Sequence, residues 1–163
     1  MLPNVKVALS LLQSKGYRLI GVTNQPASAK GKTTLRLLYE INERLRELLR
    51  ESDVDLDALL MCPHHPMGSP GAPERYLVTE CDCRKPKPGL LKKASQLFAV
   101  DIDRSYMVGD TLRDIAAGKA FGLKTVFLGD VEKTISWAES EKPDHVFENL
   151  YDFSLFVDKV VSA

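Results

Sequence analysis

The sequence predicts an α/β protein in which helices cover both faces of a parallel sheet, and three observations indicate this fold. Short runs of strand-forming residues alternate with longer amphipathic stretches, an order typical of βαβ units. The length of 163 residues suits one domain with its own core, so we expect residues 1–163 to form a single domain. Polar residues directly follow two of the apolar runs, where parallel sheets have their ligand crevice.

The first predicted elements are a helix and a strand. Val5, Ala8 and Leu12 share one face of a helix, and Gly16 suits the left-handed residue that follows a helix end. The run YRLIGV at 17–22 is apolar and rich in strand formers, and it stops at TNQP. We therefore expect a helix that turns directly into a short strand.

A long helix follows the loop ASAKGK and begins near Thr33 or Thr34. Its predicted apolar stripe has helical spacing and consists of Leu38, Ile41, Leu45 and Leu48. LLMC at 59–62 is the next predicted strand. Prolines and glycines recur through residues 63–80, and we expect these residues to form a loop.

The second half of the chain continues the alternation of helices and strands. In order, its predicted elements are a helix from about Pro88 to Phe98, the strand YMVGD (106–110), a short helix LRDIAAGKAFG (112–122), the strand KTVFL (124–128), the small strand HVF (145–147) and a last helix from Leu150. The result is a three-layer, Rossmann-like arrangement with helices on both faces of the sheet.

Composition excludes several classes of protein. The formal net charge is zero and no basic block stands apart, which argues against a nucleic-acid partner. No apolar run approaches the length of a membrane span. Lys6 and Lys15 interrupt the N-terminal stretch where a signal peptide would be apolar. We expect a soluble, cytoplasmic protein.

The cysteines predict a zinc site. The sequence has three cysteines, and an odd number argues against a framework of disulfides. Cys62-x-His64 and Cys81-x-Cys83 offer three thiolates and one imidazole, a common ligand set of closed structural zinc sites. The long loop between the two pairs is interrupted by prolines and glycines, and a bound ion would order it. We therefore expect zinc to hold the loop 62–83 at both ends.

Two alternatives to this ligand set and its function remain open. His65 is the alternative imidazole, although His64 repeats the one-residue spacing of the cysteine pair. A redox or zinc-transfer function for the cysteines is the other alternative, although C-x-C lacks the C-x-x-C geometry of thioredoxin-type pairs.

Two cations follow the last cysteine. Arg84 and Lys85 come directly after the zinc ligands, and Pro86 and Pro88 stiffen the chain before a helix that starts near Pro88. Fixed cations beside a helix start suit a phosphate group, whereas the same two residues without the zinc loop would indicate only a solvated surface. We therefore expect an anion site at Arg84 and Lys85.

The two strand ends offer groups that complement this anion site. Thr23, Asn24 and Gln25 provide a hydroxyl and two amides, which bind phosphoryl oxygens without adding charge. Asp110 follows a strand, and Mg²⁺ is commonly bound by one or two carboxylates together with substrate phosphates. Asp114 lies near the start of the next helix, where it either orients a neighbouring side chain or complements the helix dipole.

Together these motifs resemble those of the haloacid dehalogenase (HAD) superfamily of phosphatases. VTNQP resembles the second motif of the superfamily, Lys85 its third, and GDTLRD its fourth. CPHHP with CDCRKPKPG is similar to the zinc-containing branch that acts on D-glycero-D-manno-heptose 1,7-bisphosphate. The related histidinol-phosphate phosphatases share both cysteine-containing pairs and are the alternative branch. The resemblance runs from about Leu2 to the C-terminus.

The resemblance implies a Mg²⁺-dependent phosphatase with a small phosphorylated sugar as its substrate. Thr23 would hydrogen-bond the phosphoryl group, Lys85 would neutralise its developing charge, and Arg84 would recognise the sugar phosphate. Asp110 would ligate Mg²⁺. Structural zinc would be held by Cys62, His64, Cys81 and Cys83.

One motif of the resembled superfamily has no counterpart among these residues. The first motif, D-x-D-G-T/V, ends a first central strand, and its aspartates supply the nucleophile and the general acid/base. DVD and DLD at 53–57 precede a strand instead of following one. DID at 101–103 lies too close to the strand at 106–110 for a parallel crossover. We therefore expect the first central strand to be missing and these residues to be inactive by themselves.

The missing strand would leave backbone groups of its two neighbours unpaired, at ~1–3 kcal/mol for each buried group. Three explanations are open: a start codon placed too far downstream, which we favour, a deliberately shortened chain, or a chain that repacks or borrows a strand. We expect a monomer, with dimerisation through the sheet gap as the alternative. The alternative function is a non-catalytic, zinc-stabilised protein that binds phosphorylated metabolites.

Overall fold

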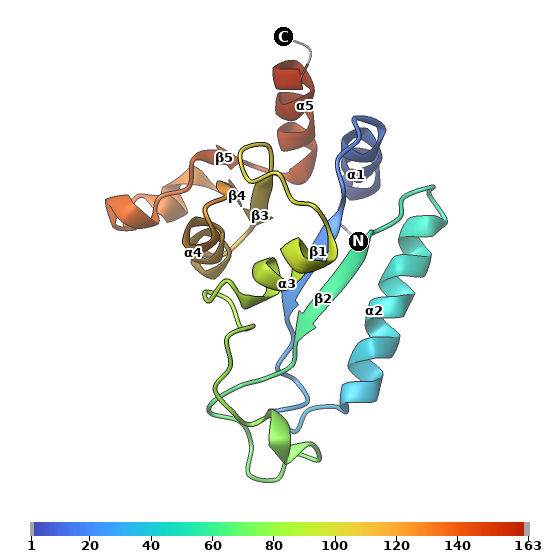
Figure 1. Cartoon of the computed structure of the whole chain (residues 1–163), viewed down its shortest axis with the longest axis vertical. Helices are drawn as coiled ribbons and strands as arrows, with labels where there is room; N and C mark the ends of the chain where they lie inside the picture. Colours follow the sequence, from blue (N-terminus) through green and yellow to red (C-terminus); the bar gives the residue numbers. More distant parts are fainter. Residues whose placement is uncertain (1, 162–163) are drawn as a thin grey trace.

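The computed structural model describes residues 2–161 and contains the predicted elements in the predicted order (Figure 1). Its helices and strands are α1 (Val5–Ser14), β1 (Ile20–Asn24), α2 (Leu35–Arg50), β2 (Ala58–Cys62), α3 (Gly89–Leu97), β3 (Tyr106–Gly109), α4 (Leu112–Phe121), β4 (Lys124–Leu128), β5 (His145–Phe147) and α5 (Leu150–Val161). Short 3₁₀ turns lie at η1 (Arg75–Leu77), η2 (Val131–Thr134) and η3 (Glu139–Glu141).

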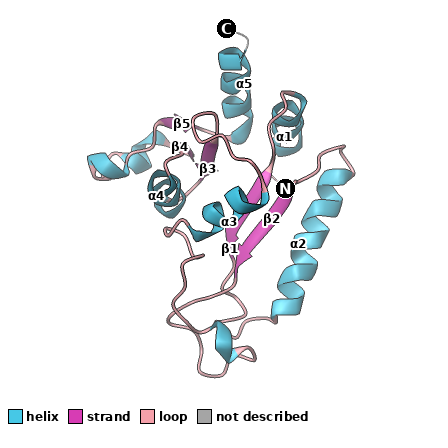
Figure 2. Ribbon diagram, viewed as in Figure 1, coloured by secondary structure: helices cyan, strands magenta, loops and turns pink. Residues whose placement is uncertain are grey.

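All strand pairs are parallel, but the described residues form two sheets instead of one. β1 pairs with β2 from Ile20↔Ala58 to Asn24↔Cys62. In the second sheet β4 lies between β3 and β5. Figure 2 shows the two groups of strands apart from each other. The break falls between β1 and β3, which is consistent with the expectation that a central strand is missing.

Helices cover both faces of the strands and join the two sheets. On one face α1 packs against α5, and the core there includes Leu12, Leu49 and Phe153. On the other face α3 contacts β1, β2 and α4, with Leu91 and Met107 in a second core cluster. The three-layer α/β fold is therefore confirmed, and it remains continuous because the helices bridge the break in the sheet (Figure 1).

The predicted apolar stripe of α2 is partly wrong. Ile41 and Leu45 are 50 % and 38 % exposed, whereas the buried positions of this helix are Leu38, Asn42 and Leu49. The physical reason is that Asn42 is used inside the protein: its Oδ1 accepts a hydrogen bond from Gln25 Nε2 at 2.8 Å. A polar residue therefore occupies the buried face of α2. The helical spacing of apolar residues was not enough to identify which face of the helix is buried.

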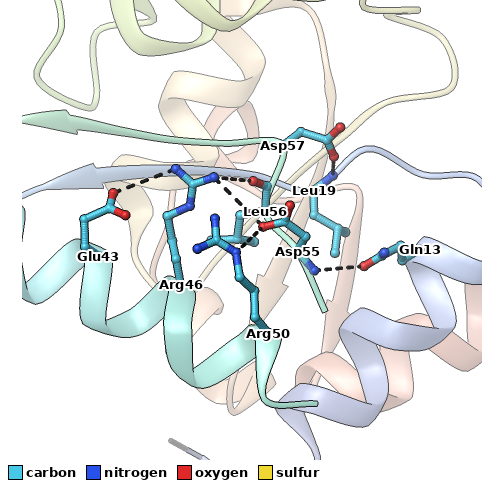
Figure 3. Close-up of polar contacts among 8 residues, drawn as sticks. All are labelled: Gln13, Leu19, Glu43, Arg46, Arg50, Asp55, Leu56 and Asp57. Carbon is cyan, nitrogen blue, oxygen red and sulfur yellow. Dashed lines mark hydrogen bonds and ion pairs between the residues drawn. The ribbon is translucent and has the colours of Figure 1, made fainter. Parts of the chain in front are cut away.

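A polar cluster lies at the N-terminal end of β2 (Figure 3), whereas the cysteine loop begins at the C-terminal end of this strand. Arg46 Nη2 donates to the Leu56 carbonyl at 3.2 Å, and Arg50 Nε pairs with Asp55 Oδ1 at 3.3 Å. The Asp55 N–H donates to Gln13 Oε1 at 3.3 Å. These contacts tie α1 and α2 to the start of β2. The aspartates of DVD and DLD lie before β2, at the amino end of the sheet, as expected, and not at the carboxyl end where the first motif of the superfamily would lie.

The replacement of Arg46 with methionine is expected to lower the free energy of unfolding by ~1–3 kcal/mol, because the buried Leu56 carbonyl loses its donor. Urea denaturation followed by circular dichroism measures the change. Arg44→Met is the matched control on the same helix, where exposed ion pairs to Glu47 and Glu51 contribute little. Equal loss of stability in both variants would contradict the structural role of Arg46.

Among residues 2–161, no helix combines the length and the apolar character that a membrane crossing requires.

Candidate functional site

The two ends of the cysteine loop meet in one cluster. The ligand atoms of Cys62, His64, Cys81 and Cys83 all lie within 4.8 Å of one another. Cys62 Sγ is 3.6 Å from Cys81 Sγ, and Cys83 Sγ is 3.4 Å from Cys81 Sγ and 3.3 Å from His64 Nδ1. His65 instead accepts a hydrogen bond from the Met67 N–H at 3.1 Å. The chain therefore folds so that the predicted set of four converges on one point.

The cluster has the dimensions of a tetrahedral zinc site. With Zn–S distances of about 2.3 Å, the edges of a tetrahedron between sulfurs are about 3.8 Å long, close to the observed separations. Burial raises the pKa of Cys62, and burial together with the neighbouring thiols raises the pKa of Cys83. Three adjacent thiolates therefore need a cation to hold them, and the residues present fit zinc in number, type and spacing.

The cysteine loop is also fastened to the start of α2. Glu74 accepts a hydrogen bond from Ser28 Oγ at 2.6 Å and another from the Leu35 N–H at 3.1 Å. The first of these bonds is the main reason why the pKa of Glu74 is lowered. Ser28 is fully buried in the loop after β1, and Glu74 lies in the loop between the cysteine pairs. The Glu74 carboxylate therefore joins these two loops.

Lys85 is attached to the end of β1 at three points. Its N–H donates to Asn24 Oδ1 at 3.1 Å, and Asn24 Nδ2 donates to the Lys85 carbonyl at 2.9 Å. Its ammonium nitrogen Nζ donates to the Val22 carbonyl at 2.6 Å. The turn after Cys83 is therefore fixed both to the cysteine cluster and to β1, and it holds Lys85 at the carboxyl end of the strand.

Asp114 connects this lysine to the second sheet. Asp114 Oδ1 lies 2.7 Å from Lys85 Nζ, and the two side chains are only 8 % and 11 % exposed. Asp114 Oδ2 accepts hydrogen bonds from the N–H and Oγ1 of Thr111, at 3.1 and 2.6 Å, at the start of α4. Gly109 permits this approach, because a Cβ there would collide with the Asp114 side chain. One carboxylate thus caps a helix and pairs with a buried ammonium.

The other predicted site residues lie at the ends of β1 and β3 and directly after the last cysteine. Thr23 is half-buried at the end of β1, and Asp110 is exposed immediately after β3. Arg84 Nη1 donates to the His64 carbonyl at 3.2 Å, which fixes part of the guanidinium to the cysteine loop. Gln25 lies differently, since its Nε2 is directed to Asn42 of α2. The roles of these residues in binding remain predictions.

Comparison with known proteins gives the class of this chain. A family model described as HAD-hydrolase-like matches residues 82–153. A relative from Salmonella typhi is 38 % identical over 152 residues, which cover 93 % of this chain and 79 % of the relative. The chain belongs to the HAD-hydrolase-like family, whose matched relatives are named as phosphatases.

The particular relatives share one name. The Salmonella typhi protein and a protein of Escherichia coli K12, 38 % identical with 93 % and 78 % coverage, are both D-glycero-beta-D-manno-heptose-1,7-bisphosphate 7-phosphatases. A D,D-heptose 1.7-bisphosphate phosphatase from B. bronchiseptica, crystallised with magnesium and phosphate, matches 99 % of this chain and 84 % of its own. Its TM-score is 0.80 and its identity 27 %. A HAD-like phosphatase from Mesorhizobium loti also has a TM-score of 0.80, with 28 % identity and coverage of 98 % and 75 %.

Two features of the site were not predicted from the sequence. The bonds between Asn24 and Lys85 join residues 61 positions apart, and Glu74 reaches Ser28 across 46 positions. An asparagine at a strand end and a glutamate in a polar loop form no local pattern that indicates a distant partner. The predicted phosphate role of Asn24 was based on its position alone, whereas its amide also holds the Lys85 backbone.

Proposed function

We propose that this chain carries the phosphate-binding and metal-binding part of a Mg²⁺-dependent phosphatase that acts on a sugar bisphosphate. The specific substrate we propose is D-glycero-D-manno-heptose 1,7-bisphosphate, from which the 7-phosphate is removed. The observation that carries the proposal is the buried Lys85–Asp114 pair, held at the carboxyl end of β1 next to the cysteine cluster. The names of the relatives support the choice of substrate.

Lys85 is suited to a phosphoryl group by its remaining hydrogen-bond capacity. An ammonium has three N–H donors, and the contacts with the Val22 carbonyl and Asp114 use two of them. The third can be donated to a phosphate oxygen, while Asp114 holds the ammonium in place. The positive charge then stabilises the charge that develops on the transferring group. Thr23 would donate its hydroxyl to the same group from the neighbouring strand end.

Two metals belong to the proposed function. Magnesium would lie at Asp110, whose exposed carboxylate at the end of β3 is an oxygen ligand of the type that Mg²⁺ prefers. When bound, the ion would neutralise phosphate oxygens during transfer. Zinc in the cysteine cluster would be structural, because four protein ligands leave no open position for substrate. Arg84, next to these ligands, would contact the sugar phosphate.

The chemical step needs a nucleophile that these residues do not provide. No D-x-D-G-T/V motif occurs in the sequence, and the aspartates at 53–57 lie at the opposite end of β2 from Thr23. On this proposal the 163 residues bind Mg²⁺ and phosphate but do not hydrolyse the substrate by themselves.

The test compares the 163-residue chain with a version extended at its N-terminus by a strand that ends in D-x-D-G-T. We expect release of phosphate from heptose 1,7-bisphosphate with Mg²⁺ in the extended version only, and no release from histidinol phosphate. Binding of inorganic phosphate with Mg²⁺ is expected in both versions, measured by titration calorimetry. Inactivity of both versions with intact phosphate binding would favour the non-catalytic binding protein. Absence of phosphate binding would overturn the proposal.

A further inference from the structure

The turn that follows β1, residues 26–32, packs against the cysteine loop near the carboxyl end of the strands (Figure 1). Ala29 of this turn is fully buried, and its carbonyl accepts a hydrogen bond from the Ser69 N–H at 2.9 Å. Gly68 permits this approach, because a Cβ there would lie 2.5 Å from the Ala29 carbonyl oxygen. The cysteine loop therefore supports the backbone of the turn directly.

Glu74 of the cysteine loop holds the same turn through its side chain. One carboxylate oxygen accepts from Ser28 Oγ at 2.6 Å, and the other accepts from the Leu35 N–H at 3.1 Å, at the start of α2. A carboxylate at this end of a helix is also favoured by the helix dipole. Lys30 lies between these two attachment points, and its own N–H donates to the Pro26 carbonyl at 3.0 Å. The backbone that carries the Lys30 side chain is therefore fixed on both sides.

Three basic side chains gather where the turn meets the cysteine loop. Lys30 is exposed, and Arg84 Nη1 donates to the His64 carbonyl at 3.2 Å. Burial lowers the pKa of His65, and the charges of Arg84 and Lys30 lower it further. Both cations therefore lie within electrostatic range of the same imidazole ring.

No carboxylate neutralises these two cations in the described part of the chain. Among residues 2–161 neither Lys30 nor Arg84 has an ion pair. Like charges that lie close together repel each other, and an anion bound between them relieves the repulsion. Because Arg84 uses one of its five N–H donors on the His64 carbonyl, it retains others for such an anion.

The two cations after Cys83 are directed to different partners. Lys85 Nζ donates to the Val22 carbonyl of β1, whereas the Arg84 guanidinium is bound to the cysteine loop. The two residues are neighbours in the chain, with Cα atoms about 3.8 Å apart. Lys85 and the pair of Lys30 and Arg84 therefore offer two separate positions for anions on one turn. Such an arrangement suits a ligand with two anionic groups on a short carbon skeleton.

We propose that Lys30 is a further specificity-determining residue, which binds the second phosphate of a sugar bisphosphate while the first phosphate lies at Lys85. Glu74 is the positioning residue that holds Lys30 in this place. The inference rests on the proposed function and adds to it the distinction between a bisphosphate and a single phosphate. A lysine that is only a solvated surface residue would affect the binding of neither ligand.

The first experiment measures the Kd of heptose 1,7-bisphosphate and of inorganic phosphate, each with Mg²⁺, by titration calorimetry on the 163-residue chain. Lys30→Met is expected to weaken binding of the bisphosphate about 10- to 100-fold, the loss of one charge-assisted hydrogen bond. The Kd of inorganic phosphate is expected to change by less than about twofold, because Lys85 is intact. Lys32→Met is the matched control, since this exposed lysine lies in the same turn and is not among the charges that act on His65.

The outcomes separate this inference from the proposed function. Equal losses for both ligands in Lys30→Met would overturn the inference, because Lys30 would then contribute only to a general positive field. An unchanged Kd of the bisphosphate, or the same loss in Lys32→Met, would overturn it as well. If the original chain binds the bisphosphate no more tightly than inorganic phosphate, the inference fails and the phosphate site at Lys85 stands. If the original chain binds neither ligand, the proposed function fails too.

A double-variant cycle tests Glu74 as a positioning residue. Glu74→Ala is expected to weaken binding of the bisphosphate by roughly 3- to 10-fold, with little change for inorganic phosphate. It is also expected to speed amide exchange at Lys30 by at least about tenfold, because the turn loses its support. In the Lys30→Met background, Glu74→Ala is expected to have no further effect on bisphosphate affinity, since its effect passes through Lys30.

Ser28→Ala covers the case in which Glu74→Ala loosens the whole cysteine loop. It removes one of the two hydrogen bonds of Glu74 with a small change in a fully buried side chain, and the same dependence on Lys30 is expected. Glu80→Ala is the control in the same loop, because this glutamate is exposed and lies 3.6 Å from Lys87 Nζ. Additive losses of bisphosphate affinity in the double variants, or an equal loss in Glu80→Ala, would show that Glu74 only stabilises the fold and would overturn its positioning role.

Discussion

Replacement of Cys83 with serine is expected to remove zinc from this chain and to lower its Tm by roughly 8–16 °C. The estimate applies when free zinc exceeds the Kd about 1,000-fold, where binding contributes about 4 kcal/mol and each kcal/mol is equivalent to about 2–4 °C in a chain of this size. The physical reason is that the four ligands join both ends of the loop 62–83, so that the free energy of zinc binding contributes directly to the order of this loop. Calorimetry and metal analysis measure the two effects.

Two neighbouring histidines provide the control. His64→Ala is expected to lose zinc as Cys83→Ser does, whereas His65→Ala is expected to retain about one zinc ion per chain. The reason is that His64 Nδ1 lies 3.3 Å from Cys83 Sγ, while His65 Nδ1 is occupied by the Met67 N–H. Loss of zinc from both variants, or from neither, would contradict the ligand set. A normal Tm after chelation would show that the loop is ordered without metal.

Replacement of Lys85 with methionine is expected to weaken binding of phosphate with Mg²⁺ by roughly 10- to 100-fold, the loss of one charge-assisted hydrogen bond. The same change is expected to lower the free energy of unfolding by ~3–5 kcal/mol, because the buried Asp114 carboxylate loses its only ionic partner among the described residues. Titration calorimetry and urea denaturation measure the two quantities separately.

A second substitution separates the binding role from the structural one. In Lys85→Met/Asp114→Asn the buried charge is removed, and we expect most of the stability to return while phosphate binding stays weak. Lys87→Met is the matched control, since this lysine is two positions away, its side chain is 47 % exposed, and its ion pairs within residues 2–161 are with exposed carboxylates. Recovery of phosphate affinity in the double variant would contradict the anion site at Lys85.

The zinc and lysine predictions are linked through the turn that joins them. Lys85 follows Cys83 by two residues, and its backbone is held by Asn24 of β1. Loss of zinc is therefore expected to loosen one end of this turn, and to weaken phosphate binding less than removal of the ammonium itself. This order of effects distinguishes a lysine that is positioned by the cluster from one that β1 alone holds.

Features with a local cause could be predicted closely. The glycines at the C-terminal ends of α1 and α4, Gly16 and Gly122, have φ of 81° and 87°, as expected for glycines that end helices. Thr34 caps α2 through a bond from the Leu37 N–H, near the predicted start. The spacing of cysteine and histidine predicted a group of four, and their ligand atoms do lie together. Each of these features depends on residues near one another in the sequence, or on side chains whose chemistry admits few partners.

Features that depend on orientation could not be predicted. The stripe of α2 contains leucine and isoleucine on more than one face, and Asn42 was buried against Gln25 in preference to Ile41. Gln25 was expected near the phosphate site, but its amide is directed to α2. A helical period gives the spacing of a face, whereas the rotation of the helix depends on the surface that it packs against.

By itself the sequence determined the order of helices and strands, the cysteine loop, and the absence of a D-x-D-G-T/V motif, because residue types and short spacings are enough for these. Only the tertiary structure decided that the Lys85 side chain is buried against Asp114 and that Asn24 hydrogen-bonds the Lys85 backbone. It also decided that the strands form two sheets with a groove between them. These features join residues far apart in the chain, and such contacts exist only once helices on both faces have brought the strand ends together.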